Sequence, residues 1–254
     1  MWSADYPFVL QNLVLKDFRV RYRNMSLGVL WSLLNPFVMM GVLVFVFTSV
    51  FPERAIRAFP LFVLCGLVPF NFFTVAWSSG MVSVTDNGGL VKRVPLPRVL
   101  LPIASVFSNC IHMLIQFAIL LGFVLLFGFG INRYWALLPV IWLCEIVFVV
   151  GLVLATAALD VFVRDLRYIV DSLIRVMFWI VPIFYGMESV PLRLRAVYEL
   201  NPVAALTIAL RRIVMEAAAP APALMLKLAV TSLAMLAAGW FVFRRLQTRF
   251  YEQL

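Results

Sequence analysis

Charged residues are scarce in this sequence. Asp, Glu, Lys and Arg make up only 13% of the 254 residues, whereas a soluble domain carries roughly a quarter. There is one histidine, His112, and the three cysteines lie inside apolar runs without the spacing of metal ligands: Cys65, Cys110 and Cys144. The sequence therefore predicts no metal site in this chain, and we interpret the cysteines as small buried apolar residues.

Sequence motifs of catalysis are also missing. No G-x-x-x-x-G-K-S/T phosphate loop occurs, so we do not expect the chain to bind and hydrolyse ATP by that route. No His-x-Glu pair, nucleophile elbow or water-facing pair of carboxylates stands out either. These absences argue against an enzyme and against a cofactor bound to this chain.

Apolar residues dominate what is present. They form 64% of the chain and give a mean hydropathy of +1.02, more than a water-soluble core could bury. A membrane-spanning helix needs about 20 mainly apolar residues, and windows of that kind lie at about 27–51, 59–84, 99–129, 134–159, 169–185 and 224–243. We therefore predict an all-α membrane protein with six transmembrane helices in a single domain, 1–254.

The net charge of +9 is distributed as short basic clusters between the apolar windows. This distribution is typical of cytoplasmic loops rather than of a surface that binds nucleic acid. With both termini in the cytoplasm, the cytoplasmic pieces carry twelve Lys and Arg and the outer loops seven, which predicts that orientation. Four of the outer seven fall within residues 188–222, so this segment is not a plain loop.

Two further elements are predicted outside the six windows. Residues 7–24 have apolar residues at helical spacing and a basic end, which indicates an amphipathic helix in the cytoplasmic membrane interface. Residues 191–215 contain an apolar stretch too short to span, and Asn201 before Pro202 is typical of a helix start. We interpret this segment as two short re-entrant helices in the outer leaflet. An amphipathic helix lying flat on the membrane is the alternative.

Few polar side chains fall within the apolar windows, and each is a candidate functional residue because burying it in lipid is unfavourable. They are Asn109, His112, Gln116, Glu145 and Arg175. The spacing of the first three places them on one face of the third span. That face either forms hydrogen bonds between helices or lines a wetted conduit. Glu145 is predicted to be a structural partner or, less simply, a proton-coupling group.

Aromatic residues make up 15% of the chain, and two sets of them share a helix face. The sets are Phe70, Phe73 and Trp77 in the second span, and Phe178, Pro182 and Tyr185 in the fifth. Aromatic walls suit a passing glycan, because sugar rings pack their C–H faces on aromatic rings. The same pattern is also expected of aromatics that face lipid or pack between helices.

Five blocks of the sequence resemble, in order, polysaccharide-export ABC transporter permeases of the O-antigen and teichoic acid exporter branch (Wzm/TagG-like). They are LVLKDFRVRYRNMSLGVLWSLLNPFVMM (13–40), FPLFVLCGLVPFNFF (59–73), DNGGLVKRVPLPRVLLP (86–102), VFVRDLRYIVD (161–171) and NPVAALTIALRR (201–212). The resemblance covers nearly the whole chain. It implies a multi-pass protein of the bacterial cytoplasmic (inner) membrane.

The resemblance also implies partners and site residues. Two copies of the chain would form a homodimer around the path of a lipid-linked glycan, with two ABC ATPase subunits that carry ATP and Mg. The implied ATPase contacts are Asp17, Phe18, Arg19, Asp86, Asn87, Lys92 and Arg93. Contacts to the lipid head group would come from Arg19, Arg21 and Arg23, which could equally be topology anchors. The channel lining would include Phe70, Phe73, Trp77, Phe178 and Tyr185, and the outer gate Asn201, Pro202, Arg211 and Arg212.

Three other functions remain as alternatives. An ABC permease for a drug or a simple lipid would share the topology without needing a continuous aromatic channel. A membrane enzyme acting on lipid-linked sugars would need an acid/base or metal cluster, which the sequence does not show. A secondary transporter would usually show internal repeats and paired intramembrane charges, and neither is apparent.

Overall fold

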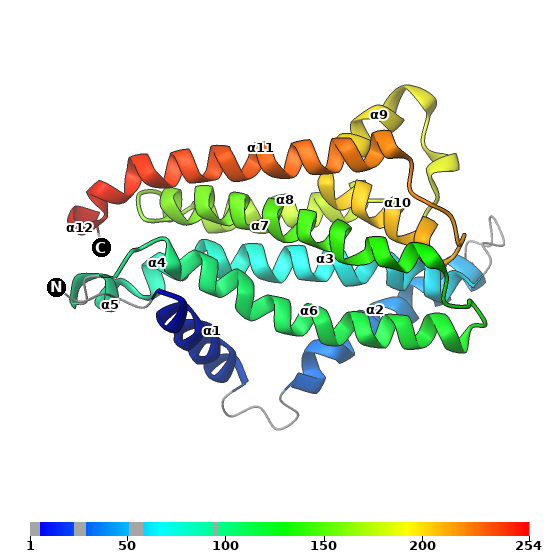
Figure 1. Ribbon diagram of the computed structural model, residues 1–254, viewed down its shortest axis with the longest axis horizontal. Helices are drawn as coiled ribbons and strands as arrows, with labels where there is room; N and C mark the ends of the chain where they lie inside the picture. Colours follow the sequence, from blue (N-terminus) through cyan, green and yellow to red (C-terminus); the bar gives the residue numbers. More distant parts are fainter. Residues whose placement is uncertain (1–5, 23–28, 51–57, 94–95, 254) are drawn as a thin grey trace.

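A computed structural model describes residues 6–22, 29–50, 58–93 and 96–253, with the backbone alone at 21–22, 29–33, 35, 93 and 251–252. Most of this chain is helical, and the described residues contain no β-strand, so the all-α prediction is confirmed. The long helices lie side by side. Helices α5 and α12 lie at one end of the bundle, the α12 end, and α9 lies at the other, the α9 end (Figure 1).

The order of the helices follows the predicted windows closely. The elements are α1 (Tyr6–Tyr22), α2 (Val29–Phe45), the π-helix η1 (Val46–Val50), α3 (Phe59–Met81), α4 (Ser83–Asp86), α5 (Gly88–Arg93), α6 (Leu100–Leu126), η2 (Arg133–Leu137), α7 (Leu138–Asp160), α8 (Leu166–Ile180), η3 (Met187–Ser189), α9 (Leu192–Leu200), α10 (Pro202–Val214), α11 (Pro222–Leu246), η4 (Gln247–Arg249) and α12 (Phe250–Gln253).

Four segments of the described chain are long and apolar enough to cross a membrane. They are α3, α6, η2 with α7, and α11 with η4, which correspond to the second, third, fourth and sixth predicted spans. The predicted first span corresponds to α2, which has 17 residues and continues directly into η1. The predicted fifth span corresponds to α8, which has 15 residues. The count of six spans therefore stays a prediction.

The fifth predicted span, 169–185, needs a correction at its end. Helix α8 stops at Ile180, because the residue before a proline is pushed out of the helical region, and Val181 before Pro182 is extended (φ −65°, ψ 131°). Pro182 and Tyr185 therefore do not share a helix face with Phe178, as the spacing had predicted.

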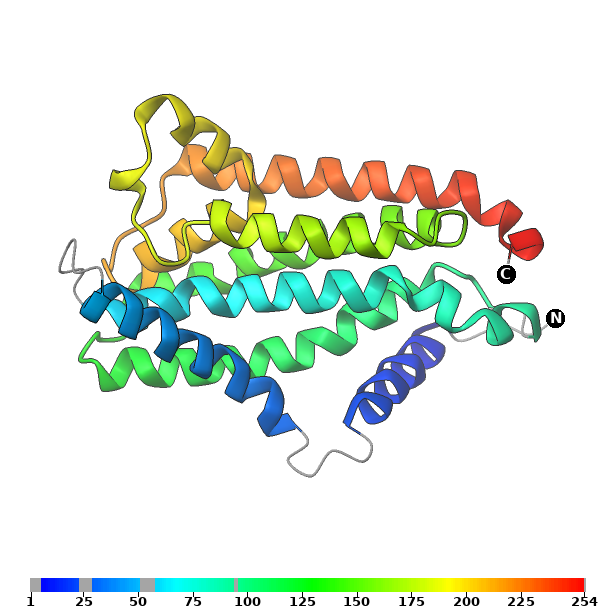
Figure 2. The ribbon, with the colours of Figure 1, turned by 180° about the vertical axis from the view of Figure 1, so that it is seen from behind.

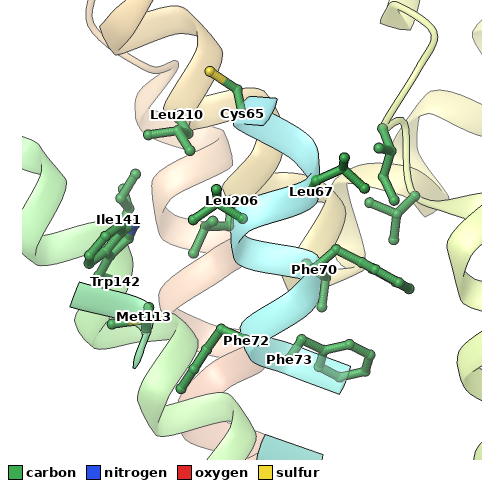
Figure 3. Packing of buried hydrophobic residues seen from close by; sticks show 14 of the residues in the cluster. Cys65, Leu67, Phe70, Phe72, Phe73, Met113, Ile141, Trp142, Leu206 and Leu210 are labelled. Carbon is green, nitrogen blue, oxygen red and sulfur yellow. The ribbon is translucent and has the colours of Figure 1, made fainter. Parts of the chain in front are cut away.

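The apolar core is built around α3. In Figure 3 the side chain of Phe72 points toward the side of α3 on which Met113 and Ile141 lie, whereas Phe70 and Phe73 point to the opposite side, where Phe73 meets Phe148 of α7. This environment explains why α3 is apolar around most of its circumference, since helices cover it on several sides. A helix surrounded in this way provides a fixed frame for its neighbours.

A second apolar cluster joins the elements at the α12 end. We call it the terminal cluster, and its buried members are Leu13, Val84, Val91, Leu101, Ala104, Leu154, Ala157, Ala158, Val161, Phe243 and Phe250. They come from α1, α4, α5, α6, α7, α11 and α12 and from the turn after α7. The amphipathic amino-terminal helix is therefore packed into the same unit as the short helices between α3 and α6 (Figure 2).

Helices α7 and α11 lie side by side along much of their length and cross at two glycines (Figure 1). A Cβ atom added to Gly239 would lie only 1.9 Å from the carbonyl oxygen of Gly151. A Cβ atom added to Gly151 would meet the backbone of Met235 and Leu236 at 2.5 Å. Small residues allow two membrane helices to approach with their backbones in contact, which increases the packing between them.

Candidate functional site

The structure brings together the two elements predicted to contact an ATPase subunit. Lys16 of α1 donates a hydrogen bond from Nζ to Oδ1 of Asn87 at 2.7 Å, and Asn87 lies between α4 and α5. Phe18 stacks on His112 of α6, with ring centroids 5.1 Å apart and planes inclined by 12°. Helix α1 is thus held both by a polar contact to the α4–α5 turn and by an aromatic contact to α6.

The other residues of that prediction lie nearby but are not all described. Asp17 lies 4.0 Å from Lys16, and the side chains of Arg19, Asp86 and Lys92 are exposed at this end. Arg23 lies outside the described residues, as do the side chains of Arg21 and Arg93. The contacts to an ATPase and to a lipid head group therefore remain predictions.

A polar cluster that the sequence pattern did not predict lies next to these elements. Asp160, the last residue of α7, is fully buried and accepts a hydrogen bond from the hydroxyl of Thr85 in α4. Arg167, in the first turn of α8, donates from Nε to Oδ1 at 3.1 Å and from a terminal nitrogen to Oδ2 at 3.2 Å. The same guanidinium lies 3.8 Å from Asp86. The block VFVRDLRYIVD contains Arg167, but nothing in the pattern showed that it pairs with Asp160 across the turn.

The polar face of α6 forms hydrogen bonds to other helices. Asn109 donates to the hydroxyl of Ser79 at 2.9 Å, and Asn71 donates to Oε1 of Gln116 at 3.2 Å, with Ser79 and Asn71 both on α3. His112, between them in the same stripe, meets Phe18. Of the two interpretations of this stripe, these contacts support the hydrogen bonds between helices.

The Asn71–Gln116 pair provides a first test. Replacing both residues with leucine, singly and together, should give a coupling energy on the order of 0.6 kcal/mol, the average for hydrogen bonds between membrane helices. The measurement is a double-mutant cycle of unfolding free energies in detergent. Pairing Asn71→Leu with Thr231→Val on α11, whose hydroxyl donates to carbonyls of its own helix, should give a coupling near zero. A coupling of zero for Asn71–Gln116 would contradict the assignment.

Glu145 and Arg175 differ sharply in their surroundings. Glu145 is buried within α7, and neither carboxyl oxygen has a hydrogen-bond partner within the described part of the chain. Arg175 is exposed on α8. Glu145 therefore has no ion pair among the described residues, and burial without a partner strongly disfavours a charged carboxylate.

The aromatic residues predicted to line a channel fall into two groups. Phe70, Phe73 and Trp77 are buried in the core around α3, where Trp77 also donates to Thr156 of α7 at 3.3 Å. In this structure they have almost no surface available to a passing molecule. Phe178 is half-buried and meets Phe70 edge-on, with centroids 5.6 Å apart.

Tyr185 has a different position because α8 ends before it. Its hydroxyl lies 2.6 Å from the carbonyl oxygen of Ile180 and 3.0 Å from that of Trp179, at the end of α8. A second tyrosine, Tyr198 of α9, is 3.3 Å away. Tyr185 therefore satisfies carbonyl groups that the end of a helix leaves free.

Arg211 of α10 lies in what we call the Arg211 cradle, formed by the carbonyl oxygens of Phe62, Pro182 and Ile183. Its guanidinium donates to Phe62 at 3.0 and 3.2 Å, to Pro182 at 2.5 Å and to Ile183 at 2.6 Å. It also lies 3.4 Å from the centroid of the Phe62 ring. A Cβ atom at Gly66 would meet Ile183 at 2.9 Å and Arg211 at 3.1 Å, so only glycine leaves room there.

The other residues of the predicted gate have simpler surroundings. Asn201 accepts a hydrogen bond from the backbone of Val203 at 3.1 Å, and Pro202 is the first residue of α10, so the predicted helix start is confirmed. Arg212 is exposed and lies 3.8 Å from Glu216. The Arg211 cradle connects α10 to the start of α3 and to the turn after α8, which the sequence pattern did not indicate.

Helix α8 exposes a mixed polar and aromatic stripe. Residues at helical spacing along one face are all exposed in the single chain: Tyr168, Asp171, Ser172, Arg175 and Trp179. Next to this stripe an apolar groove of about 560 Å³ lies between α2, η1 and α8, lined by Met39, Val42, Leu43, Val46, Phe47, Phe178 and Trp179. A membrane helix with charged residues on an exposed face needs a wetted passage or a protein partner there.

Comparison with protein families decides the family. A family model described as "ABC-2 type transporter" matches residues 9–215, from α1 to the residue after α10. The chain belongs to the ABC-2 type transporter family. The match covers both elements predicted to contact an ATPase, the α8 stripe and Arg211, so the family assignment includes every candidate site described above.

Some curated relatives of this ABC-2 transporter chain match it over nearly its full length. An O-antigen export system permease protein RfbA of Myxococcus xanthus is 29% identical over 98% of this chain and 96% of its own length. The protein of that name from Klebsiella pneumoniae is 27% identical over 100% and 98%. The polysialic acid transport protein KpsM of Escherichia coli is 23% identical over 72% of this chain and 71% of its own length.

Proposed function

We propose that this chain is the transmembrane subunit of an ABC exporter that moves a lipid-linked polysaccharide across the bacterial cytoplasmic membrane, driven by a separate ATPase subunit. The observation that carries the proposal is the end-to-end similarity to O-antigen export permease proteins, together with family membership. In this arrangement the chain has no ATPase site of its own, and ATP with Mg binds to the partner subunit.

The α12 end is assigned to the cytoplasm, with six spans and both termini on that side. Helix α1 and the α4–α5 turn form the surface for the ATPase subunit, because Lys16 and Asn87 connect them into one unit. Basic residues at the end of α1, Arg19 among them, draw the head group of the lipid carrier. The two short helices α9 and α10 form the outer gate on the opposite side.

Two copies of the chain surround the path of the polysaccharide. The exposed polar and aromatic stripe of α8 supports this arrangement. Its polar side chains hold water along the passage, and its aromatic side chains stack on sugar rings. A second copy covers the neighbouring apolar groove between α2 and α8. The wall thus consists of the α8 stripe (Tyr168, Asp171, Ser172, Arg175 and Trp179), with Phe178 and Tyr185 at its edge.

The α8 stripe can be tested by chemical labelling. In the assembled exporter, Ser172→Cys should react with a membrane-impermeant maleimide at least about tenfold faster than Leu173→Cys, because a thiol must ionise in water to react. Leu173 is also an exposed residue of α8, but it is apolar and lies outside the polar and aromatic stripe. Cys65 and Cys110 are buried, whereas Cys144 is half-buried and is replaced with alanine in both variants to remove its background labelling. Equal labelling rates at Ser172→Cys and Leu173→Cys would contradict the proposal that the α8 stripe faces water.

The function itself is tested by reconstitution. The chain is co-purified with the ATPase subunit that binds it, placed in proteoliposomes and given a lipid-linked polysaccharide on the ATPase side. The expected result is polysaccharide in the opposite compartment with ATP and none with a non-hydrolysable analogue. Export of a fluorescent drug or a simple lipid, without polysaccharide, would instead favour the alternative permease. A complex that modifies the lipid-linked sugar would favour a membrane enzyme.

A further inference from the structure

Helix α8 is connected to the α12 end in an unusual way. Among the described residues, no member of the terminal cluster comes from α8, although seven other helices contribute to it. Val170 is the one residue of α8 that is fully buried. At this end of the bundle α8 packs against the main apolar core through Leu166 and Val170, whereas its link to α4 and to the end of α7 is polar.

That polar link is the contact set of Asp160. Its carboxylate accepts from Thr85 of α4 and from two nitrogens of Arg167 of α8, and it belongs to α7 itself. Two parallel hydrogen bonds fix the orientation of a guanidinium as well as its distance from the carboxylate. Arg167 also reaches Asp86, one residue after Thr85. One buried carboxylate thus joins α4, α7 and α8.

The position of Asp160 is not explained by the stability of α7. A carboxylate at the last residue of a helix faces the negative end of the helix dipole, which is unfavourable. A fully buried carboxylate is costlier still unless it is paired. Its two partners come from α4 and α8. The terminal cluster contains a residue of α4 but none of α8, so it does not connect these two helices.

We propose that Thr85, Asp160 and Arg167 are positioning residues that couple movement of the ATPase-facing α4–α5 turn to α8, the wall of the polysaccharide path. This inference rests on the proposed function, because that function places the moving ATPase subunit at the α4–α5 turn and the polysaccharide path along α8. The displacement begins at Asn87 and Thr85, passes through the Asp160 carboxylate and rotates or shifts α8 through Arg167.

The decisive quantity is the amount of polysaccharide exported per ATP hydrolysed. Thr85→Val keeps the shape of the side chain and removes the donor to Asp160. We expect it to lower this ratio roughly tenfold or more, the size of effect that follows from losing a hydrogen bond to a charged group. ATP hydrolysis and the amount of assembled complex should stay within about twofold of wild type. Thr231→Val makes the same chemical change at a hydroxyl that donates within α11 and should leave the ratio unchanged.

A second variant protects the test against a loss of folding. Arg167 is 43% exposed, so Arg167→Lys can be accommodated, and it keeps the charge while removing the bidentate geometry. It should lower the ratio as well. If both variants leave the ratio at the wild-type value, or reduce ATP hydrolysis and export in parallel, the three residues only stabilise the structure and the coupling role is wrong.

A distance measurement separates this inference from the proposed function. Spin labels at Ser172→Cys on α8 and Leu233→Cys on α11 report whether α8 moves when a non-hydrolysable ATP analogue is added to the complex. We expect a change in distance that Thr85→Val abolishes, whichever molecule is exported. If the wild-type complex exports no polysaccharide but shows this change in distance, the proposed substrate is wrong and the proposed coupling is supported. An unaltered distance change in Thr85→Val would overturn the coupling.

Discussion

Replacing Arg211 with alanine is expected to destabilise the protein by on the order of 3 to 5 kcal/mol, and to lower its Tm in detergent by roughly 10 °C. The variant leaves carbonyl oxygens of Phe62, Pro182 and Ile183 buried without the guanidinium that now donates to them. Each unsatisfied buried acceptor is unfavourable by about 1 to 3 kcal/mol. The stacking on Phe62 is lost at the same time.

The neighbouring arginine provides the matched control. Arg212 is exposed, and its contact with Glu216 at 3.8 Å joins two exposed side chains. Arg212→Ala should therefore change stability by less than about 0.5 kcal/mol. Arg211→Lys should fall between the two, since one ammonium group cannot replace the planar fork. A Tm for Arg211→Ala within a degree of wild type would show that the cradle does not hold the α9 end together.

Replacing Gly239 with leucine is expected to separate α7 from α11. Even a Cβ atom would lie 1.9 Å from the carbonyl oxygen of Gly151, and that oxygen is backbone, which cannot rotate away. Overpacking usually destabilises by about 1 to 3 kcal/mol, and a clash with backbone belongs at or above the upper end. The variant should accumulate poorly in the membrane, and the purified fraction should unfold at lower temperature.

Glycines in open positions give the comparison for this effect. Gly122 on α6 and Gly41 on α2 have nothing within 4 Å of an added Cβ atom. Gly122→Ala should be neutral or slightly stabilising, because alanine favours a helix over glycine. If Gly239→Leu and Gly122→Ala were equally stable, the crossing of α7 and α11 would not depend on close backbone contact.

The sequence contained the local signals for the helices but not the neighbours that they meet. The start of α10 at Asn201 and Pro202 depends on two adjacent residues, so it was predictable. The early end of α8 was also signalled locally by Pro182, but the apolar residues beyond it extended the window. Hydropathy measures how apolar a segment is. It does not detect that proline lacks a backbone N–H group, so it does not show where the helix ends.

The candidate sites required information that one chain's pattern does not hold. Phe70 and Phe73 share a helix face with Trp77 as predicted, yet that face packs inward, because periodicity shows which residues align and not what they align with. Asp160 and Arg167 are separated by only seven positions, but pairing them requires the turn between α7 and α8. Arg211 was predicted in the outer gate only through the resemblance of the block NPVAALTIALRR, and only the fold placed backbone carbonyls around it.

The Arg211 cradle also has a consequence for how the protein is made. Phe62 and Arg211 are 149 positions apart in the chain, so the carbonyl oxygen of Phe62 enters the membrane long before its arginine leaves the ribosome. Pro182 and Ile183 wait for a further stretch of synthesis as well. During that interval, water or the insertion machinery must satisfy these groups. The α9 end therefore cannot reach its final packing before α10 has been synthesised, and chains truncated ahead of Arg211 are expected to be exposed to proteolysis at this end.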